Sequence, residues 1–338
     1  MGLFDRQKTA KQLRSAYSNG FQGCPLDPAD HELMLQEGLV GMCGDTASEP
    51  IKDLHKERPR SLLFKPLRLL DPPTGGRNQG GLASESQTTG DCTSHGTRNC
   101  IDGTRAVEIV VDNQPEQWVA RGATEYIYSG RGHGGAGMSP QRATRIVSEG
   151  QLLRLDYSQD GGPNLTKYNA RLGMDNGRRG IPKSWADIAR NELKSHKFYT
   201  PRSVEDALDC MAAGFCGHAG SQFGSRSNTG NDGLNHKTES WNHDMAHFGY
   251  DLTREIWKVE VAFVPNSWGA WNKPNKVWLA NEEVLGPWIP GMLVVPIEEF
   301  ERHIINARST YYHAQVEGDR IAPIPLTTGG SVHWGVAA

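Results

Sequence analysis

The segment Gln87-Thr-Thr-Gly-Asp-Cys92 carries the residue types of a nucleophilic site. A helix is predicted to begin at Cys92, and a thiol at a helix N-terminus faces unsatisfied N–H groups and the positive end of the helix dipole, which stabilise the thiolate. Gln87 lies on the loop that enters this helix, and its amide can point to the same place as the Cys92 backbone N–H. Two such donors form an oxyanion hole. The stretch alone also fits a buried, inert cysteine.

Two stretches in the second half of the chain offer partners for such a thiol. His243 lies on a predicted strand that can present its imidazole at a cleft. Asn266 begins the segment Asn-Ser-Trp-Gly. Its side-chain oxygen can accept a hydrogen bond from one imidazole nitrogen so that the other faces the thiol, and Trp268 can shield that bond from water. Taken singly, each stretch also fits a packing histidine or a turn asparagine.

Other candidates fit this chemistry less well. His95 follows Cys92 by three residues and is a rival base, but a neighbour on the same helix face points alongside the thiol rather than toward it across a cleft. His247 shares a strand face with His243 and is predicted to pack in the core or to line a secondary pocket. Cys210 and Cys216 have no nearby base and are predicted to be buried thiols.

The order, spacing and flanks of the three stretches resemble the papain-like (C1) cysteine peptidases, over about residues 79–307. The resemblance implies a hydrolase that cleaves peptide or amide bonds of a peptide or protein substrate. It implies Gln87 as the oxyanion-hole residue, Cys92 as the nucleophile, His243 as the general base and Asn266 as the residue that orients it.

The resemblance also implies a substrate-binding cleft. Gly134 and Gly135 correspond to the Gly-Gly pair that lines the family's cleft and pairs with the substrate backbone. Asp244, next to His243, is expected near a substrate pocket, where its charge favours the imidazolium form. Trp268 is expected at the same site.

Several features of the sequence depart from the family pattern. Thr93 replaces the aromatic residue after the nucleophile, and Thr89 stands where papain has a disulfide cysteine. The Gln-to-Cys spacing is one residue shorter than in papain. Residues 1–75 do not resemble the family's inhibitory propeptide. In these features, the sequence is more similar to the divergent family members encoded by bacteriophages and bacteria than to papain.

The elements expected around these residues give an α+β pattern, with helices first and strands later. Gly96 and Gly103 on the helix after Cys92 indicate that another backbone packs closely there. The resemblance implies a papain-like two-lobe fold, a helical lobe plus a β-barrel-like lobe. The expected division is an N-terminal accessory segment with its linker (1–75), a papain-like domain (76–310, with a helical lobe at about 80–195 and a β lobe at about 196–310) and a C-terminal tail (311–338).

The composition argues against several other classes of function. The 338 residues carry a net charge of −3, which gives no broad electrostatic basis for binding nucleic acid or an anionic membrane. No stretch approaches the roughly 18 apolar residues of a membrane span, and the N-terminus lacks the apolar core of a signal peptide, so cytoplasmic synthesis is expected. Six cysteines without zinc-ligand spacing predict no metal and no cofactor.

Two alternatives to the peptidase stay open at this point. The first is a structural or assembly protein of a phage particle, on a papain-like scaffold with weak or no activity. It would be incorporated into a virion and would contact phage structural proteins through residues 1–75 and the C-terminal tail. A cleft blocked by residues 1–75 would favour this alternative. The second is a peptidoglycan amidase.

Overall fold

The computed structural model describes residues 9, 12, 15, 23–25, 27–42, 58–63, 85–111, 121–193, 197–226, 230–286, 288–307, 309–315 and 331–333. The described α-helices are α2 Pro28–Gln36, α3 Cys92–Val111, α4 Thr124–Ser129, α5 Pro140–Glu149, α6 Ala170–Asn176, α7 Lys183–Ala189, α8 Val204–Ala212, α9 Lys276–Ala280, α10 Glu282–Leu285 and α11 Ile297–His303. The strands are β1 Val40–Met42, β2 Ser61–Leu63, β3 Lys197–Thr200, β4 Gly217–Ser221, β5 His243–His247, β6 Gly249–Asp251, β7 Val261–Pro265, β8 Met292–Pro296, β9 Thr310–Gln315 and β10 Ser331–His333.

The strands form two five-stranded sheets, in the orders β1-β3-β9-β4-β5 and β10-β2-β6-β7-β8. Only Phe248 separates β5 at the edge of the first sheet from β6 in the second. Helices α3–α7 precede all strands except β1 and β2. The predicted α+β class is therefore confirmed.

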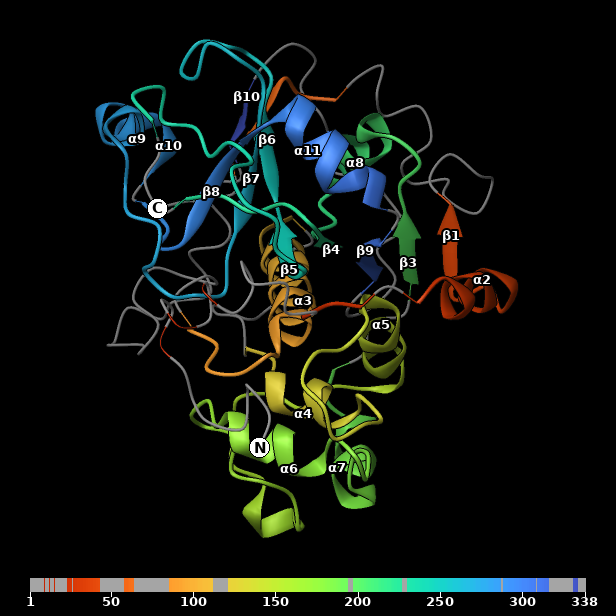
Figure 1. Cartoon of the computed structure of the whole chain (residues 1–338). Helices are drawn as coiled ribbons and strands as arrows, with labels where there is room; N and C mark the ends of the chain where they lie inside the picture. Colours follow the sequence, from red (N-terminus) through yellow and green to blue (C-terminus); the bar gives the residue numbers. More distant parts are fainter. Residues whose placement is uncertain are drawn as a thin grey trace.

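Helix α3 occupies the middle of the molecule, with the strands of the C-terminal half on one side and α4, α6 and α7 on the other (Figure 1). It packs along β5 at very short range. A Cβ atom on Gly96 would lie 2.0 Å from Asp244 Oδ1, and one on Gly103 would lie 2.8 Å from Cys216 Sγ. The close approach of another backbone predicted from these glycines is confirmed at Gly96, whereas the neighbours of Gly103 are the side chains of Cys216 and Phe248.

Side-chain caps begin three of the helices. Asp27, Ser139 and Ser203 each accept a hydrogen bond from a backbone N–H three residues later, and proline follows the first two caps. Such caps satisfy amide groups that the first helical turn leaves without partners.

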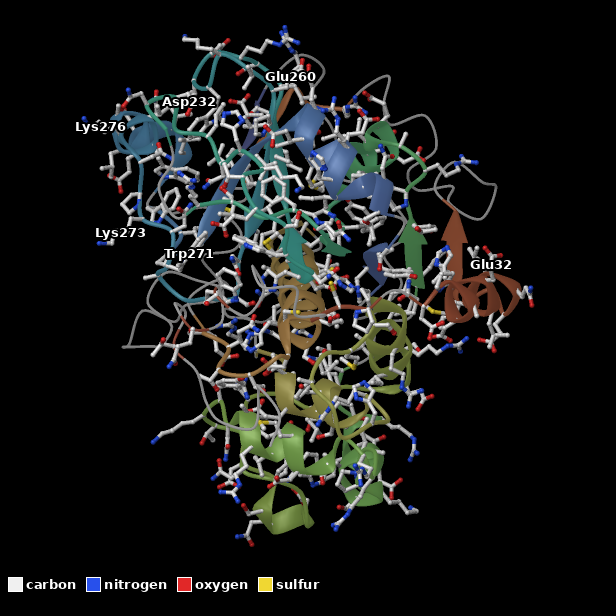
Figure 2. All side chains as sticks on the ribbon, in the orientation of Figure 1. Glu32, Asp232, Glu260, Trp271, Lys273 and Lys276 are labelled. Carbon is white, nitrogen blue, oxygen red and sulfur yellow. The ribbon has the colours of Figure 1, made fainter. Side chains whose placement is uncertain are left out.

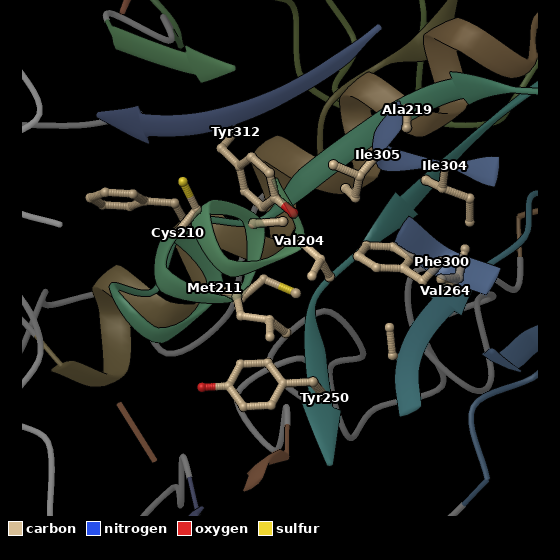
Figure 3. Packing of buried hydrophobic residues seen from close by; sticks show 14 of the residues in the cluster. Val204, Cys210, Met211, Ala219, Tyr250, Val264, Phe300, Ile304, Ile305 and Tyr312 are labelled. Atoms are coloured by element: carbon tan, nitrogen blue, oxygen red, sulfur yellow. The ribbon is translucent and has the colours of Figure 1, made fainter. Parts of the chain in front are cut away.

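A large apolar core lies between α8, α11 and the sheets. It includes Val204 and Met211 of α8, Tyr250, Phe300 of α11 and Tyr312 (Figure 3). The charged side chains labelled in Figure 2, Glu32, Asp232, Glu260, Lys273 and Lys276, lie at the periphery. Within the described residues, no helix combines the length and the apolar character needed to cross a bilayer.

The expected division of the chain needs correction at both ends. β1 and β2, within the segment 1–75, are strands of the two sheets. β9 begins at the expected end of the papain-like domain and lies in the middle of the first sheet, between β3 and β4. Tyr311 and Tyr312 are fully buried. Residues 310–315 are therefore a structural part of the domain rather than the start of a tail.

Gly96→Ala tests the α3–β5 contact. Gly-to-Ala changes inside a helix usually raise stability by about 1 kcal/mol. Here we expect the free energy of unfolding to fall by about 1–3 kcal/mol, because the new methyl group overlaps the buried Asp244 carboxylate.

Urea unfolding followed by circular dichroism measures the change. Gly135→Ala is the control, since Gly135 is exposed and its Cβ would meet only the His133 side chain, at 3.3 Å. A Gly96→Ala midpoint at or above that of the unmodified protein would contradict the packing described here.

Candidate active site

His243 and Asn266 form the best-defined pair of the site. His243 begins β5, and Asn266 directly follows β7. His243 Nε2 donates to Asn266 Oδ1 over 2.9 Å, and both residues are fully buried. The contact predicted between these two side chains is present, and it leaves Nδ1 as the ring nitrogen that can exchange a proton with another group.

Aromatic rings enclose this hydrogen bond. The Trp268 ring lies 4.8 Å from the His243 ring at an interplanar angle of 35°, and the Trp241 ring lies 6.1 Å away, edge-on. Trp268 is 1% exposed. Burial lowers the pKa of His243 to about 4, the bond to Asn266 raises it, and the nearby charge of His95 lowers it. The imidazole is therefore neutral in this closed state.

Cys92 is the first residue of α3, as predicted, and is fully buried. It shares one buried cluster with Cys24, Trp241 and Trp268. One turn further along α3, Gly96 touches Asp244, the residue after His243. The start of α3 and the start of β5 therefore meet at the same place, beside the tryptophans that flank the imidazole.

The loop before Cys92 is held by the residue after Asn266. Gln87 N–H donates to the Ser267 carbonyl over 2.8 Å, and Ser267 Oγ donates to Gln87 Oε1. Because Oε1 is held as an acceptor, the amide nitrogen is the end of Gln87 that remains to donate. Gln87 Nε2 donates to the Thr89 carbonyl over 2.8 Å. Nothing in the sequence pattern singled out Ser267 for this contact.

A backbone segment that sequence reasoning missed lies across the site. We call residues 23–25 the strap. Gly23 N–H donates to the Asn242 carbonyl over 3.0 Å, and the Gly23 carbonyl accepts from Met138 N–H over 3.1 Å. The strap therefore pairs with the residue before His243 on one side and with the segment before α5 on the other.

The next strap residue, Cys24, points into the site. Its side chain is 2% exposed, and a Cβ on Gly220 of β4 would lie 3.3 Å from both Cys24 Cβ and Sγ. Burial raises the pKa of the Cys24 thiol, and the charges of Cys92 and Asp244 raise it further. Cys24 is therefore a neutral thiol that fills space next to Cys92.

Gly134 and Gly135 directly precede Ala136, which packs against the buried cluster that contains Cys92. Their role in binding substrate stays a prediction. Both are exposed, and the nearest side chains are Arg178 and His133 respectively. The loop continues beyond them, so Gly137 N–H reaches the Gly90 carbonyl and Met138 pairs with the strap. Thr93 fixes this position, since its hydroxyl donates to the Met138 carbonyl over 2.8 Å.

Asp244 is paired elsewhere than expected. Successive strand residues point to opposite faces, and the Asp244 carboxylate lies 3.0 and 3.2 Å from His218 Nδ1. Burial raises the pKa of Asp244, and His218 lowers it. The expectation that Asp244 favours imidazolium at His243 is therefore wrong, because its charge is directed to His218.

His95 does not face Cys92 as a rival base. It is fully buried, with Nε2 3.5 Å from Asp91 Oδ2 and Nδ1 3.9 Å from Glu85 Oε2. His247 packs edge-on against Phe300 and Tyr312, as predicted. Among the described side chains, no group of three or more His, Cys, Asp or Glu is arranged to hold a metal ion.

Solved structures resemble this chain, although no protein-family profile and no curated protein sequence matches it. Xylellain, a cysteine protease from Xylella fastidiosa, is 14% identical, with a TM-score of 0.53 over 95% of this chain and 100% of that one. Procathepsin B S9 from Trypanosoma congolense is 12% identical, with a TM-score of 0.50 over 90% of this chain and 89% of that one. The chain therefore has the papain-like fold that the sequence predicted.

Buried histidines should make the protein sensitive to acid. Burial lowers the pKa of His247 to about 3. The folded state keeps this imidazole neutral, whereas the unfolded state takes up a proton below about pH 6.5, so stability is lost as the pH falls below 6.5. We expect His247→Gln to reduce the slope of unfolding free energy against pH by about 1.4 kcal/mol per pH unit between pH 6 and 4.

Urea unfolding at a series of pH values checks this slope. His236→Gln is the control. The bond to Glu299 raises the pKa of His236, burial lowers it and Asp232 raises it. That imidazole is protonated in both states below pH 6, so its removal should leave the slope unchanged. Equal slopes for His247→Gln and the unmodified protein would contradict the role assigned to His247.

Proposed function

We propose that this protein is a thiol peptidase that hydrolyses peptide or amide bonds with Cys92 as its nucleophile. The observation that carries the proposal is the 2.9 Å hydrogen bond from His243 to Asn266, enclosed by tryptophans where β5 meets the start of α3. A buried imidazole fixed through Nε2 keeps Nδ1 for proton transfer, and a helix N-terminus favours the thiolate.

The proposed reaction is acyl transfer in two stages. Cys92 Sγ first passes its proton to His243 Nδ1, and the thiolate then attacks the substrate carbonyl. The oxyanion that forms accepts from Gln87 Nε2 and the Cys92 backbone N–H. His243 gives its proton to the leaving amine, which leaves a thioester on Cys92. His243 then takes a proton from water, whose oxygen attacks the thioester and releases the acid. Asn266 keeps the imidazole oriented throughout.

The strap must move before a substrate can bind. Gly23 pairs through its backbone with Asn242 and Met138, one partner on each side of the site. An extended peptide substrate offers the same N–H and carbonyl groups, so strap and substrate compete for these partners. Displacement of the strap also admits water, which raises the pKa of His243 toward its ordinary value because burial is what lowers it.

Hydrolysis of a fluorescence-quenched peptide library tests the function. We expect Cys92→Ala to remove the activity. Gln87→Ala should lower the rate about 10²–10³-fold, the usual loss for one oxyanion donor. Cys210→Ala is the control, since Cys210 is buried in the core around α8. Full activity in Cys92→Ala would show that the nucleophile is elsewhere.

The blocked cleft also favours a second candidate, a papain-like scaffold without activity. Cys92 is fully buried, and the strap belongs to the segment 1–75. The two functions differ in what happens when the strap is loosened. Gly23→Pro removes the N–H that reaches Asn242, while Gly23→Ala keeps it and serves as the control.

For a peptidase, we expect Gly23→Pro to hydrolyse the library about fivefold faster than Gly23→Ala. One backbone hydrogen bond contributes about 1 kcal/mol, which corresponds to that factor. The gain should vanish when Cys92→Ala is added. No hydrolysis by any of these chains would favour the scaffold, and a slower Gly23→Pro would refute competition between strap and substrate.

A further inference from the structure

Tyr168 lies outside the motifs that sequence analysis singled out, yet its hydroxyl contacts both ends of the loop 88–91. This loop lies between Gln87 and Cys92. Thr88 N–H donates to Tyr168 Oη over 3.2 Å, and Tyr168 Oη donates to Asp91 Oδ2 over 2.8 Å. One oxygen atom thus pins the first and the last residue of the loop to the helical half of the molecule.

The direction of the second bond follows from the surroundings of the phenol. Tyr168 is half-buried as a residue, and the burial of its hydroxyl together with the negative charge of Asp91 raises its pKa well above the ordinary value. The hydroxyl therefore stays protonated and donates to the carboxylate. A hydrogen bond to an ionised acceptor is stronger than one between neutral groups.

A buried ion network supports the acceptor. His95 Nε2 lies 3.5 Å from Asp91 Oδ2, and the His95 ring packs edge-on against the Tyr168 ring at 5.2 Å. On its other side, His95 Nδ1 lies 3.9 Å from Glu85, which pairs with Arg98 at 3.0 Å and Arg154 at 2.8 Å. Asp91 therefore contacts a histidine that is itself held in place by buried charged side chains.

The loop pinned in this way sets the direction of the oxyanion donor. Gln87 Nε2 donates to the carbonyl of Thr89, which is the middle of the loop. A shift of the loop would move Thr89 and turn the Gln87 amide with it. Oxyanion donors act only within about 3 Å of the developing charge, so a small displacement is costly.

We propose that Tyr168 is a positioning residue that holds the loop 88–91 through Thr88 and Asp91 and so directs Gln87 to the oxyanion. The proposal rests on the peptidase function above. Tyr168 itself touches no reacting atom. Tyr168 affects the reaction only through Gln87. Loss of its hydroxyl should therefore matter only while Gln87 is present, unlike the loss of a residue needed only for folding.

Tyr168→Phe tests the proposal, since it keeps the ring against His95 and removes only the hydroxyl. We expect kcat for peptide hydrolysis to fall about tenfold with KM changed less than twofold, because the oxyanion exists only in the transition state. In the Gln87→Ala variant, adding Tyr168→Phe should lower kcat less than twofold, since the donor that Tyr168 positions is already absent.

Tyr157→Phe is the matched control. Its hydroxyl accepts from Leu153 N–H over 3.1 Å in the same half of the molecule, away from the loop, and its loss should leave kcat unchanged. Equal losses from Tyr168→Phe in the presence and absence of Gln87 would overturn the proposal. So would an unchanged kcat in Tyr168→Phe.

Amide hydrogen exchange of peptides covering residues 86–91 tests the positioning without any substrate. We expect Tyr168→Phe to speed exchange of this loop about tenfold and to leave the middle of α3 unchanged, as Tyr157→Phe should leave both. Unchanged loop exchange refutes the proposal. If the loop loosens as expected but no chain hydrolyses peptides, the proposed function fails while the positioning holds.

Discussion

The close packing of α3 along β5 is the constraint on which the site depends. Gly96 leaves no room for a side chain, because Asp244 Oδ1 occupies the place of its Cβ. Asp244 in turn is fixed by His218 of β4, so the contact is built into the register of the first sheet. This contact joins the helix that begins with Cys92 to the strand that begins with His243. Without it, the histidine could not act on the thiol.

Around this contact, one turn after β7 organises the remaining groups. Asn266 orients the imidazole, and Ser267 holds Gln87 through both its backbone and its side chain. Trp268 packs over the imidazole ring. The strap closes the same place from the N-terminal side, using backbone groups on both flanks. These parts are assembled and buried beneath the strap, and under the proposed function strap movement is the step that separates a latent peptidase from an inert scaffold.

The sequence predicted the parts of the site that rest on local patterns. The helix start at Cys92 was predicted from the sequence around it, and the His243–Asn266 contact follows from a short motif next to a strand. The strap was not predictable, because its bonds use backbone atoms that any residue provides and reach partners more than 100 residues away. The pairing of Asp244 depends on how β4 and β5 align, which composition and spacing do not specify.

The central claim is that Cys92 becomes an activated thiolate when the strap opens, and is not merely a packing cysteine. Brief treatment of the full chain with iodoacetamide at about pH 6, followed by peptide mass mapping, measures this directly, because alkylation requires the thiolate and an unperturbed thiol has a pKa of about 8.5. All five described cysteines are buried, so burial alone does not favour any one of them. The account predicts that Cys92 is alkylated well ahead of the other cysteines and that His243→Ala removes this preference. Labelling of Cys92 no faster than that of Cys100, Cys210 or Cys216 would contradict it.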